Sequence, residues 1–468
     1  MYLETGRSTR FAVITEPIDL LRKRVSSPIL TEQTDGYDAA RKVQSATVDA
    51  HPYAIVQVQT AEDVAATVDF ARELGFSLAV RSGGHSLGHY SMVDDAVVVD
   101  FSQMKRIAVD PATGIAKVQA GASSADIVVA AQPHGLALTT GDTGSVGIGG
   151  LTTGGGIGFL ARKHGLTIDN LLSAEVVLAD GRIVTASRYE HPSLFWAIRG
   201  GGGNFGIVTE FTFQLARVDS VLGGILVLPA TREVVRGYLD ASTSAPEGLT
   251  TIAFIMHAPP APFIPEHRTG EVVLGILTVW TGDEAEGARA LAPMPALAEP
   301  VADTIGPMPY GEIYRYTDHQ SMPHAASIRQ MFADELSDRA IDEMLAAVAS
   351  STSPFSLINL RGLGGALDKV APEATAFAHR NRKYFVAVIG LWLDPTQDAA
   401  PHQAWTEELW GKIRGEGSGV YVNFLEREGD ARIHEAYPGA TYERLVDVKT
   451  AYDPENLFQF NQNIKPRG

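Results

Sequence analysis

Short apolar runs separated by polar turns mark the first half of the chain and predict buried strands. They lie at residues 54–58, 77–80, 96–100 and 115–119. Between the first two runs, apolar residues recur every three or four positions, which is the period of a helix that buries one face. These residues are Val64, Val68, Ala71 and Leu74. Thr60, followed by Asp63, is expected to cap that helix at its N-terminus.

A hairpin and a further strand complete this mixed α and β pattern. Residues 174–179 and 182–186 are predicted to pair, because Asp180-Gly181 between them is a two-residue turn signal. Residues 207–213 are rich in β-branched and aromatic side chains, which also favours a strand.

The pattern changes after Phe213. Glycine becomes sparser, and prolines gather at positions 259, 260, 262 and 265, where we expect an exposed loop. Predicted strands at residues 252–257, 271–280 and 384–392 alternate with helical windows at 231–243, 283–292 and 338–349. This order predicts an antiparallel sheet with helices on one face.

Composition excludes several kinds of chemistry. The 468 residues include no cysteine, so the chain can form no disulfide, zinc–thiolate site, iron–sulfur cluster or cysteine nucleophile. Any redox reaction would therefore need a cofactor. The apolar fraction of 45% is ordinary for a globular protein that buries a large core, and the length allows more than one domain.

Charge and hydropathy restrict the partners. The chain has 38 basic and 55 acidic residues, a formal net charge of −17, and no basic cluster that would follow a nucleic-acid backbone. Residues 1–17 lack the apolar run of a signal peptide, and no window approaches 18 uninterrupted apolar residues. We expect a cytoplasmic protein that acts on a small molecule, with no nucleic-acid or membrane partner; the oligomeric state is not evident from the sequence.

Glycine is concentrated in three loops that predict a binding site. Three glycines lie within residues 83–88, nine within 141–158 and five within 200–206. Such loops let a backbone approach a ligand closely, and their amide groups can bind an anion without a lysine. This suits an acidic protein that holds a planar, anionic cofactor such as one with a pyrophosphate.

Two familiar motifs fail in this context. Residues 201–206 have the spacing G-x-G-x-x-G, but a predicted strand follows them where a dinucleotide fingerprint requires a helix. His85 and His89 have the spacing of two metal ligands on a helix, yet Gly83, Gly84 and Gly88 make a helix improbable, and we assign no metal. His85 instead follows a strand and could act as a neutral nucleophile toward an electrophilic ring.

Five segments together resemble the berberine-bridge-enzyme-like branch of the FAD-linked oxidases, within the vanillyl-alcohol-oxidase superfamily. The segments are Arg81-Ser82-Gly83-Gly84-His85-Ser86, the stretch from Gly147-Ile148-Gly149-Gly150 to Gly158, Asp169-Asn170-Leu171, the stretch from Leu194 to Gly202, and the stretch from Tyr452-Asp453-Pro454 to Ile464. They cover both ends of the chain and leave about residues 218–415 without a sharp motif.

The resemblance implies an α+β architecture with a two-part FAD-binding domain of the PCMH type. Residues 1–217 and 416–468 would form this domain, and residues 218–415 would form an inserted substrate domain with an antiparallel sheet covered by helices. The site is expected between them, as ligand pockets often are.

The resemblance also assigns the cofactor contacts. His85 would bond to the 8α carbon of the flavin, and the loop from Arg81 to Ser86 would hold the pyrophosphate through backbone amides. Thr143 stands where relatives have a second, cysteinyl link, so a singly attached FAD is expected. The other implied contacts are Gly141, Val146, Gly147, Gly149, Gly150, Gly155, Gly158, Ile207, Asn461 and Asn463.

Catalysis is expected to depend on Tyr421 and Asn423. Some relatives use a glutamate after a Gly-Gly pair, and our alignment places Pro372 at that position. Others use a tyrosine from a Tyr-x-Asn segment, which Tyr421-Val422-Asn423 matches. A tyrosine is a poor base at neutral pH unless hydrogen bonds or a positive charge favour its phenolate, and an isolated tyrosine is more often a core residue.

The leading function is therefore an oxidase that transfers hydride from an alcohol, sugar or amine to FAD, with oxygen as acceptor. Val146 aligns with a position where a small side chain is associated with oxygen access. The alternatives are a dehydrogenase, a biosynthetic catalyst of ring closure or desaturation, and a flavin-binding protein without turnover; an NAD-dependent dehydrogenase is the most distant. Aromatic candidates for the substrate pocket are Phe254, Trp280, Tyr310, Tyr314 and Trp392.

Overall fold

A small sheet opens the chain and ends at the first glycine loop. The computed structural model describes residues 16–317 and 322–468. The sheet order is β1 (Ile29–Leu30), β2 (Ala54–Gln57), β4 (Val97–Asp100) and β3 (Leu78–Arg81). Strand β4 lies between β2 and β3 and is parallel to both. The helices of this part are α1 (Pro17–Arg24), α2 (Tyr37–Ala40) and α3 (Ala61–Leu74).

The predicted helix cap is confirmed. The Thr60 side chain accepts a hydrogen bond from the Asp63 amide, and α3 ends at Gly75, whose positive φ of 73° permits the left-handed turn. The Asp63 carboxylate does not close a capping box; it accepts hydrogen bonds from Ser26 and Ser27 in the preceding segment. The cap therefore also connects α3 to the chain that precedes β1.

A five-stranded antiparallel sheet follows. Its order is β5 (Ile107–Asp110), β6 (Ile115–Gln119), β10 (Ile207–Gln214), β8 (Leu171–Val177) and β9 (Ile183–Ser187). The predicted hairpin is β8–β9, with Gly181 at φ 81° in its turn. Around this sheet lie α4 (Ser124–Ala131), α5 (Ile148–Gly154), α6 (Ala161–His164), α7 (Pro192–Ala197) and the short pair β7 (Leu136–Ala137) and β11 (Ala216–Arg217).

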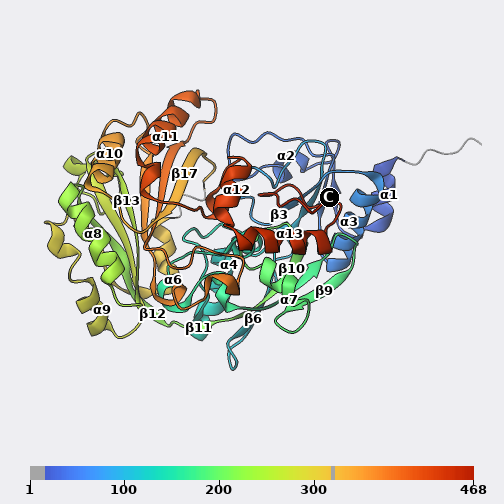
Figure 1. Cartoon of the computed structure of the whole chain (residues 1–468), viewed down its shortest axis with the longest axis horizontal. Coiled ribbons are helices and arrows are strands. Elements are labelled where there is room, and N and C mark those ends of the chain that lie inside the picture. Colours follow the sequence, from blue (N-terminus) through green and yellow to red (C-terminus); the bar gives the residue numbers. More distant parts are fainter. Residues whose placement is uncertain (1–15, 318–321) are drawn as a thin grey trace, which may run out of the picture.

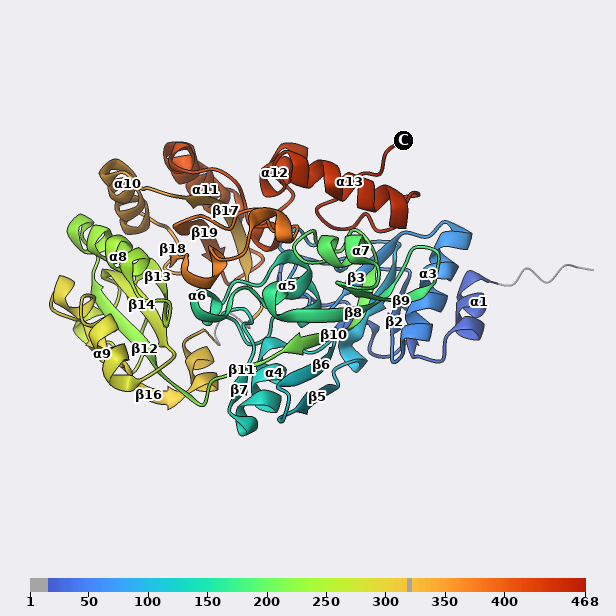
Figure 2. The same cartoon turned by 60° about the horizontal axis from the view of Figure 1, so that its bottom comes forward.

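The middle of the chain forms an eight-stranded antiparallel sheet, as its pattern predicts. The path is β15 (Ala302–Asp303), β12 (Ser220–Pro229), β14 (Val272–Trp280), β13 (Leu249–His257), β18 (Leu357–Gly362), β19 (Tyr384–Trp392) and β17 (Ala325–Ala333), and β16 (Gly306–Pro309) pairs with β12. Four helices cover one face: α8 (Arg232–Ser244), α9 (Glu284–Leu291), α10 (Asp338–Ala349) and α11 (Ala400–Ile413). In Figure 2 they lie outside the sheet, and the other half of the protein lies on its opposite side.

The last segment returns to the first half. Helices α12 (Asp430–Ala436) and α13 (Ala440–Tyr452) lie beside it in Figure 1, and Leu445 and Val448 of α13 join its hydrophobic core. The fully buried Lys449 ammonium donates to the carbonyl groups of Asn204 and Phe458 and to Asp453. This buried cation therefore connects α13 to the third glycine loop and to the C-terminal tail.

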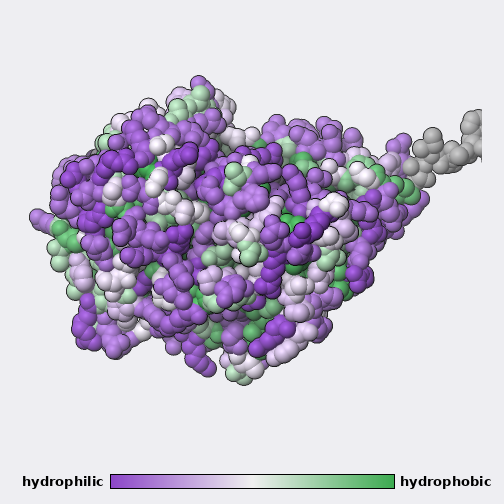
Figure 3. Space-filling view, in the orientation of Figure 1, coloured by the Kyte–Doolittle hydropathy of each residue, from purple (hydrophilic) through white to green (hydrophobic). Residues whose placement is uncertain are grey.

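The face drawn in Figure 3 is mainly hydrophilic, and its hydrophobic patches are small and separate. The prolines at 259, 260, 262 and 265 are exposed, as predicted for a loop. In the described residues no helix combines the length and the apolar character needed to cross a membrane. Residues 1–15, where the sequence lacks a signal-peptide pattern, lie outside the described part.

Candidate active site

The side chain of Arg81, at the start of the loop after β3, binds groups outside that loop. Arg81 makes an ion pair with the fully buried Asp100 at 3.2 Å and donates to the carbonyl groups of Ala40 and Lys42. Its side chain therefore fixes the base of the loop. The Ser82 hydroxyl donates to the Ala120 carbonyl at 2.6 Å and accepts from the Gly149 amide at 3.2 Å, so Ser82 holds the first glycine loop against the second.

The amide groups of this loop are available to an anion. Within the described residues, none of the amides from Gly83 to Leu87 donates a hydrogen bond. Gly83 is exposed, but the residues from Gly84 to Leu87 are buried or half-buried, and donors of this kind require partners. Gly84 has a φ of 75°. A Cβ on Gly83 would lie 2.3 Å from the Gly147 nitrogen, so the two loops can touch only because both residues are glycine. The loop fits the pyrophosphate of a dinucleotide.

His85 lies in this loop beside the second glycine segment. Its Nε2 is 3.0 Å from the Ser145 hydroxyl. Burial, together with the nearby His324, lowers the pKa of His85 to about 4, while Ser145 acts in the opposite direction. The imidazole is therefore neutral at physiological pH, which is the nucleophilic form. Thr143 and Val146 lie in the same segment, buried and half-buried respectively.

The glycines from 154 to 158 are required by protein contacts. A Cβ on Gly154 would lie 1.9 Å from the Asn423 side chain, and one on Gly155 would lie 3.2 Å from the Tyr421 ring. A Cβ on Gly158 would lie 1.6 Å from the Thr140 carbonyl oxygen. In this stretch the missing side chains admit the Tyr421-Val422-Asn423 segment, whereas Gly150 is exposed with no neighbour within 4 Å.

Tyr421 and Asn423 lie together against this segment. The Tyr421 hydroxyl accepts hydrogen bonds from the Gly156 amide at 2.8 Å and from the Asn423 amide nitrogen at 2.9 Å. Asn423 also donates to the Leu151 carbonyl. Burial raises the pKa of Tyr421, while the two donors and the charge of Arg361 act to lower it. The phenol is 2% exposed, so it is both a core residue and a hydrogen-bonded polar group.

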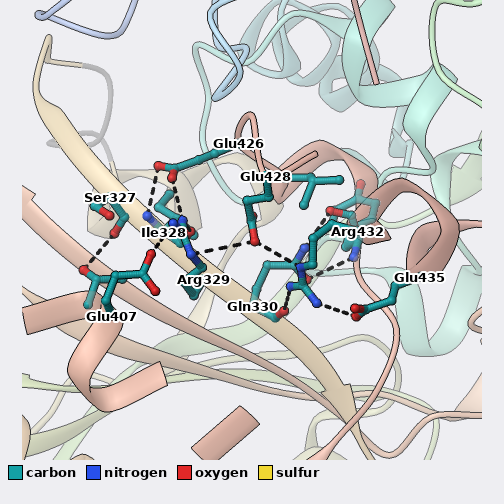
Figure 4. Close-up of polar contacts among 12 residues, drawn as sticks. Ser327, Ile328, Arg329, Gln330, Glu407, Glu426, Glu428, Arg432 and Glu435 are labelled. Carbon is teal, nitrogen blue, oxygen red and sulfur yellow. Dashed lines mark hydrogen bonds and ion pairs between the residues drawn. The ribbon is translucent and has the colours of Figure 1, made fainter. Parts of the chain in front are cut away.

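An extended polar network holds the backbone of Tyr421. The Gln330 side chain accepts from the Tyr421 amide at 3.0 Å and donates to its carbonyl group at 3.2 Å. Figure 4 shows Gln330 between two arginines of this network. Arg432 donates to the Gln330 carbonyl and pairs with Glu428, while Arg329 pairs with Glu426 at 2.8 Å. Strand β17 is therefore tied to the segment after Tyr421.

The C-terminal asparagines present unpartnered atoms. The side-chain oxygens of Asn461 and Asn463 are buried without a hydrogen-bond partner in the described residues. Asn461 also donates to the Gly203 carbonyl at 3.2 Å. Ile207, in contrast, is a core residue that pairs with Val177 at the start of β10. That strand directly follows residues 201–206, so these glycines form a turn and do not open a helix.

Pro372, which the sequence alignment places at the glutamate of some relatives, lies in the short helix Pro372–Ala374. This helix is beside α7, where Trp196 donates to the Glu373 carbonyl group. Pro372 also lines an open surface groove of about 550 Å³, and Tyr421 is not among the residues that line this groove.

The sequence analysis missed Arg361 and Asp142. Arg361, on β18 of the large sheet, lies near Tyr421 and binds Asp142 at 2.8 Å. A charged residue inside the apolar strand of residues 357–362 was the available signal.

The aromatic candidates divide between the two faces of the large sheet. Trp280 belongs to the helix-covered core, and Trp392 stacks on His402 of α11. Phe254, Tyr310 and Tyr314 belong to the opposite face. The Tyr314 hydroxyl donates to the Gly141 carbonyl at 3.0 Å. No three potential metal-ligating side chains cluster in residues 16–317 and 322–468.

Comparison with known proteins identifies the family. Residues 52–187 match the family described as an FAD binding domain, and residues 420–465 match the one described as berberine and berberine like. FAD-linked oxidoreductase YgaK of Bacillus subtilis is 30% identical over 95% of this chain and 98% of its own. The chain belongs to the berberine-bridge-enzyme-like FAD-linked oxidoreductases.

Two further similarities concern one activity. (R)-6-hydroxynicotine oxidase of Paenarthrobacter nicotinovorans is 31% identical over 95% of this chain and 98% of its own. The crystal structure of 6-hydroxy-D-nicotine oxidase from Arthrobacter nicotinovorans superposes with a TM-score of 0.85 at 26% identity and the same coverage. These relatives confirm the α+β fold and an FAD-dependent oxidoreductase. The free amides, the close-packed glycines and the unpartnered asparagine oxygens fit that cofactor.

Neutral histidines make stability depend on pH. Burial also lowers the pKa of His379 to about 4. Because the pKa values of His85 and His379 lie below the value of about 6.5 in an unfolded chain, the unfolded state takes up protons first as the pH falls. The stability is present above pH 6.5 and is lost between pH 6.5 and 4.

We expect each histidine to contribute a loss of about 2 kcal/mol between pH 7 and 5 in the flavin-free protein. Chemical denaturation at the two pH values measures this loss. His85→Gln and His379→Gln should each reduce the loss by about 2 kcal/mol. If a variant lost as much stability as the wild type between pH 7 and 5, the histidine that it replaces would not be buried in its neutral form.

Proposed function

We infer that the protein is an oxidase that removes hydride from a small-molecule alcohol, sugar or amine, with FAD held covalently by His85 and oxygen as the final acceptor. The single observation that carries this inference is the family membership. The neutral His85, in a loop whose amides donate no hydrogen bond to the described residues, supports the covalent link. The flavin supplies the hydride-accepting ring. The substrate would enter between the inserted domain, residues 218–415, and the FAD-binding domain, residues 1–217 and 416–468.

Residues of the chain would bind the cofactor and take the substrate proton. Backbone amides of residues 83–87 would bind the pyrophosphate, and Asn461 and Asn463 would offer acceptor oxygens to the same cofactor. The other predicted contacts along residues 141–158 and at Ile207 remain proposals. Because residue 143 is a threonine and the chain has no cysteine, no second, cysteinyl link to the flavin can form. Tyr421 would take a proton from the substrate O–H or N–H, and Asn423 would hold its hydroxyl group in place.

Two donors to the Tyr421 oxygen support this role. A phenol that accepts hydrogen bonds from Gly156 and Asn423 has its own proton free to point elsewhere, and the same donors stabilise the phenolate when the proton moves. Burial opposes the phenolate, so Tyr421 is a neutral phenol at rest. It would have to lose its own proton to solvent, aided by the two donors and the charge of Arg361, before it could take a proton from the substrate.

The covalent link is tested by His85→Ala. The purified wild-type protein should stay yellow after acid precipitation, and its mass should exceed that of the chain by one FAD. His85→Ala should release all colour on precipitation, whereas His134→Ala, at an exposed histidine, should keep it. A colourless wild-type precipitate of unmodified mass would refute the link.

The general base is tested by Tyr421→Phe in flavin-loaded protein. An anaerobic screen of alcohols, sugars, amines and phenolic polycycles, followed by flavin bleaching, first supplies a substrate. Tyr421→Phe should then slow flavin reduction by about 10² or more, because proton transfer is lost. Tyr189→Phe, at a tyrosine that is 81% exposed, should reduce at the wild-type rate. Near-normal reduction in Tyr421→Phe removes this residue from the role.

Oxygen as acceptor is tested by stopped-flow mixing of reduced protein with oxygen. We expect reoxidation within seconds and formation of hydrogen peroxide. Val146→Leu should slow this step by filling space, while Val129→Leu, at a valine that is 75% exposed, should not. Reoxidation over minutes in the wild type would identify a dehydrogenase instead.

A further inference from the structure

Strand β18 carries two polar side chains toward the cofactor half of the protein. Ile358 and Leu360 belong to the helix-covered core. Because side chains alternate along a strand, Asn359 and Arg361 face the opposite side, where the glycine segments lie. Both are buried, with 2% and 4% exposure. A fully charged residue is rarely placed so deeply without a specific partner.

The contacts of Arg361 use only part of its guanidinium. Its Nε donates to the Asn359 side-chain oxygen at 3.0 Å, and its Nη2 donates to Asp142 at 2.8 Å. Its Nη1 donates to none of the residues in the described part of the chain. An arginine has five N–H donors in a planar fork, so three hydrogens of Arg361, two on Nη1 and one on Nη2, have no acceptor among the described residues.

The guanidinium of Arg361 lies near Tyr421 and contacts two rings that Tyr421 also contacts. The guanidinium carbon lies 5.6 Å from the centre of the Phe385 ring and 5.2 Å from that of Phe424. Tyr421 packs against the same two rings, at 6.2 and 5.7 Å. Asp142 comes from the loop that leads to Thr143 and Val146. Arg361 therefore lies where the sheet, the second glycine loop and the Tyr421 segment meet.

The charges around the Arg361 guanidinium favour a negatively charged ligand. Asp142 is the one carboxylate within ion-pair distance of Arg361 among the described residues. Arg162 lines the same small cavity as Arg361 and donates to the carbonyl groups of Leu249, Leu363 and Ala245, with no ion pair in the described part of the chain. Asp368 acts on it only from a longer range. Two buried guanidiniums beside a single ion-paired carboxylate favour a further negative charge.

We propose that Arg361 is a specificity-determining residue that binds a carboxylate group of the substrate through its Nη1 edge, next to Tyr421. This proposal rests on the proposed function, because it assumes that Tyr421 borders the reacting atoms. A carboxylate matches the fork geometry and charge of arginine. The substrate class is therefore a carboxylic acid that also carries the alcohol or amine to be oxidised.

The test uses benzoate and benzamide as probes of the flavin-loaded protein. The two molecules have the same shape and differ in charge. Isothermal titration calorimetry gives both dissociation constants, and the flavin absorption spectrum reports whether the probe lies near the ring. We expect benzoate to bind about tenfold or more tightly than benzamide, because a charge-assisted hydrogen bond separates them.

Variants assign that preference to Arg361. Arg361→Gln should weaken benzoate binding about tenfold or more and leave benzamide within about twofold, and Arg361→Lys should lie between them because it keeps the charge without the fork. Arg339→Gln, at an exposed arginine of α10, should bind both probes as the wild type does. Circular dichroism and flavin content show whether each variant is folded.

Equal affinity of the wild type for benzoate and benzamide would overturn the proposal without any variant. So would a loss in Arg361→Gln that affects both probes equally. These outcomes are separate from the proposed function, which fails if the purified protein carries no flavin or if no substrate bleaches it. A flavin-loaded oxidase that prefers benzamide leaves the oxidase standing and removes Arg361 from substrate recognition.

Discussion

The hydrogen bond from the Gly156 amide to the Tyr421 hydroxyl is the contact on which the site depends. It joins the second glycine segment to a residue 265 positions later. One hydrophobic cluster surrounds it and takes Ile157 from that segment, Phe332 and Phe385 from the large sheet, and Tyr421 from the returning tail. Any shift of the sheet relative to the glycine segment would have to break this bond or open the cluster. The relative placement of the two halves therefore fixes the geometry around the phenol.

Patterns of neighbouring residues were sufficient to predict several helices, turns and strands of the fold. The Thr60 cap, the Asp180-Gly181 hairpin and the strand after residues 201–206 form as expected, since each depends on neighbours in sequence. The first glycine loop and His85 follow β3 as predicted. Each of these features is determined by backbone requirements, such as a positive φ or a free amide, that glycine and turn residues record directly in the sequence.

The polar partners inside the core could not be predicted in the same way. Gln330 lies 91 residues from Tyr421, and Arg361 lies 219 residues from Asp142, and nothing in a single sequence pairs them. The alignment to Pro372 shows the same difficulty, because a Gly-Gly pair marks a turn but not which neighbouring side chain faces the site. Arg380 and Asp169 form another such buried pair, joined by two hydrogen bonds across the halves. Tertiary packing decides these contacts.

Three cationic side chains are buried inside a chain whose net charge is strongly negative. A net charge of −17 repels free anions from the surface, yet Arg162, Arg361 and Lys449 are buried inside, held chiefly by carbonyl groups and single carboxylates. Removing such cations from water is costly, and each persists because several acceptors are fixed around it. Around Tyr421 this arrangement means that burial and charge act in opposite directions on the same phenol. Burial keeps the phenol protonated at rest, whereas Arg361 and the two donors lower the cost of losing its proton to solvent. The resulting phenolate would accept a hydrogen bond from the substrate O–H or N–H and then take that proton, which links proton removal to occupancy of the site.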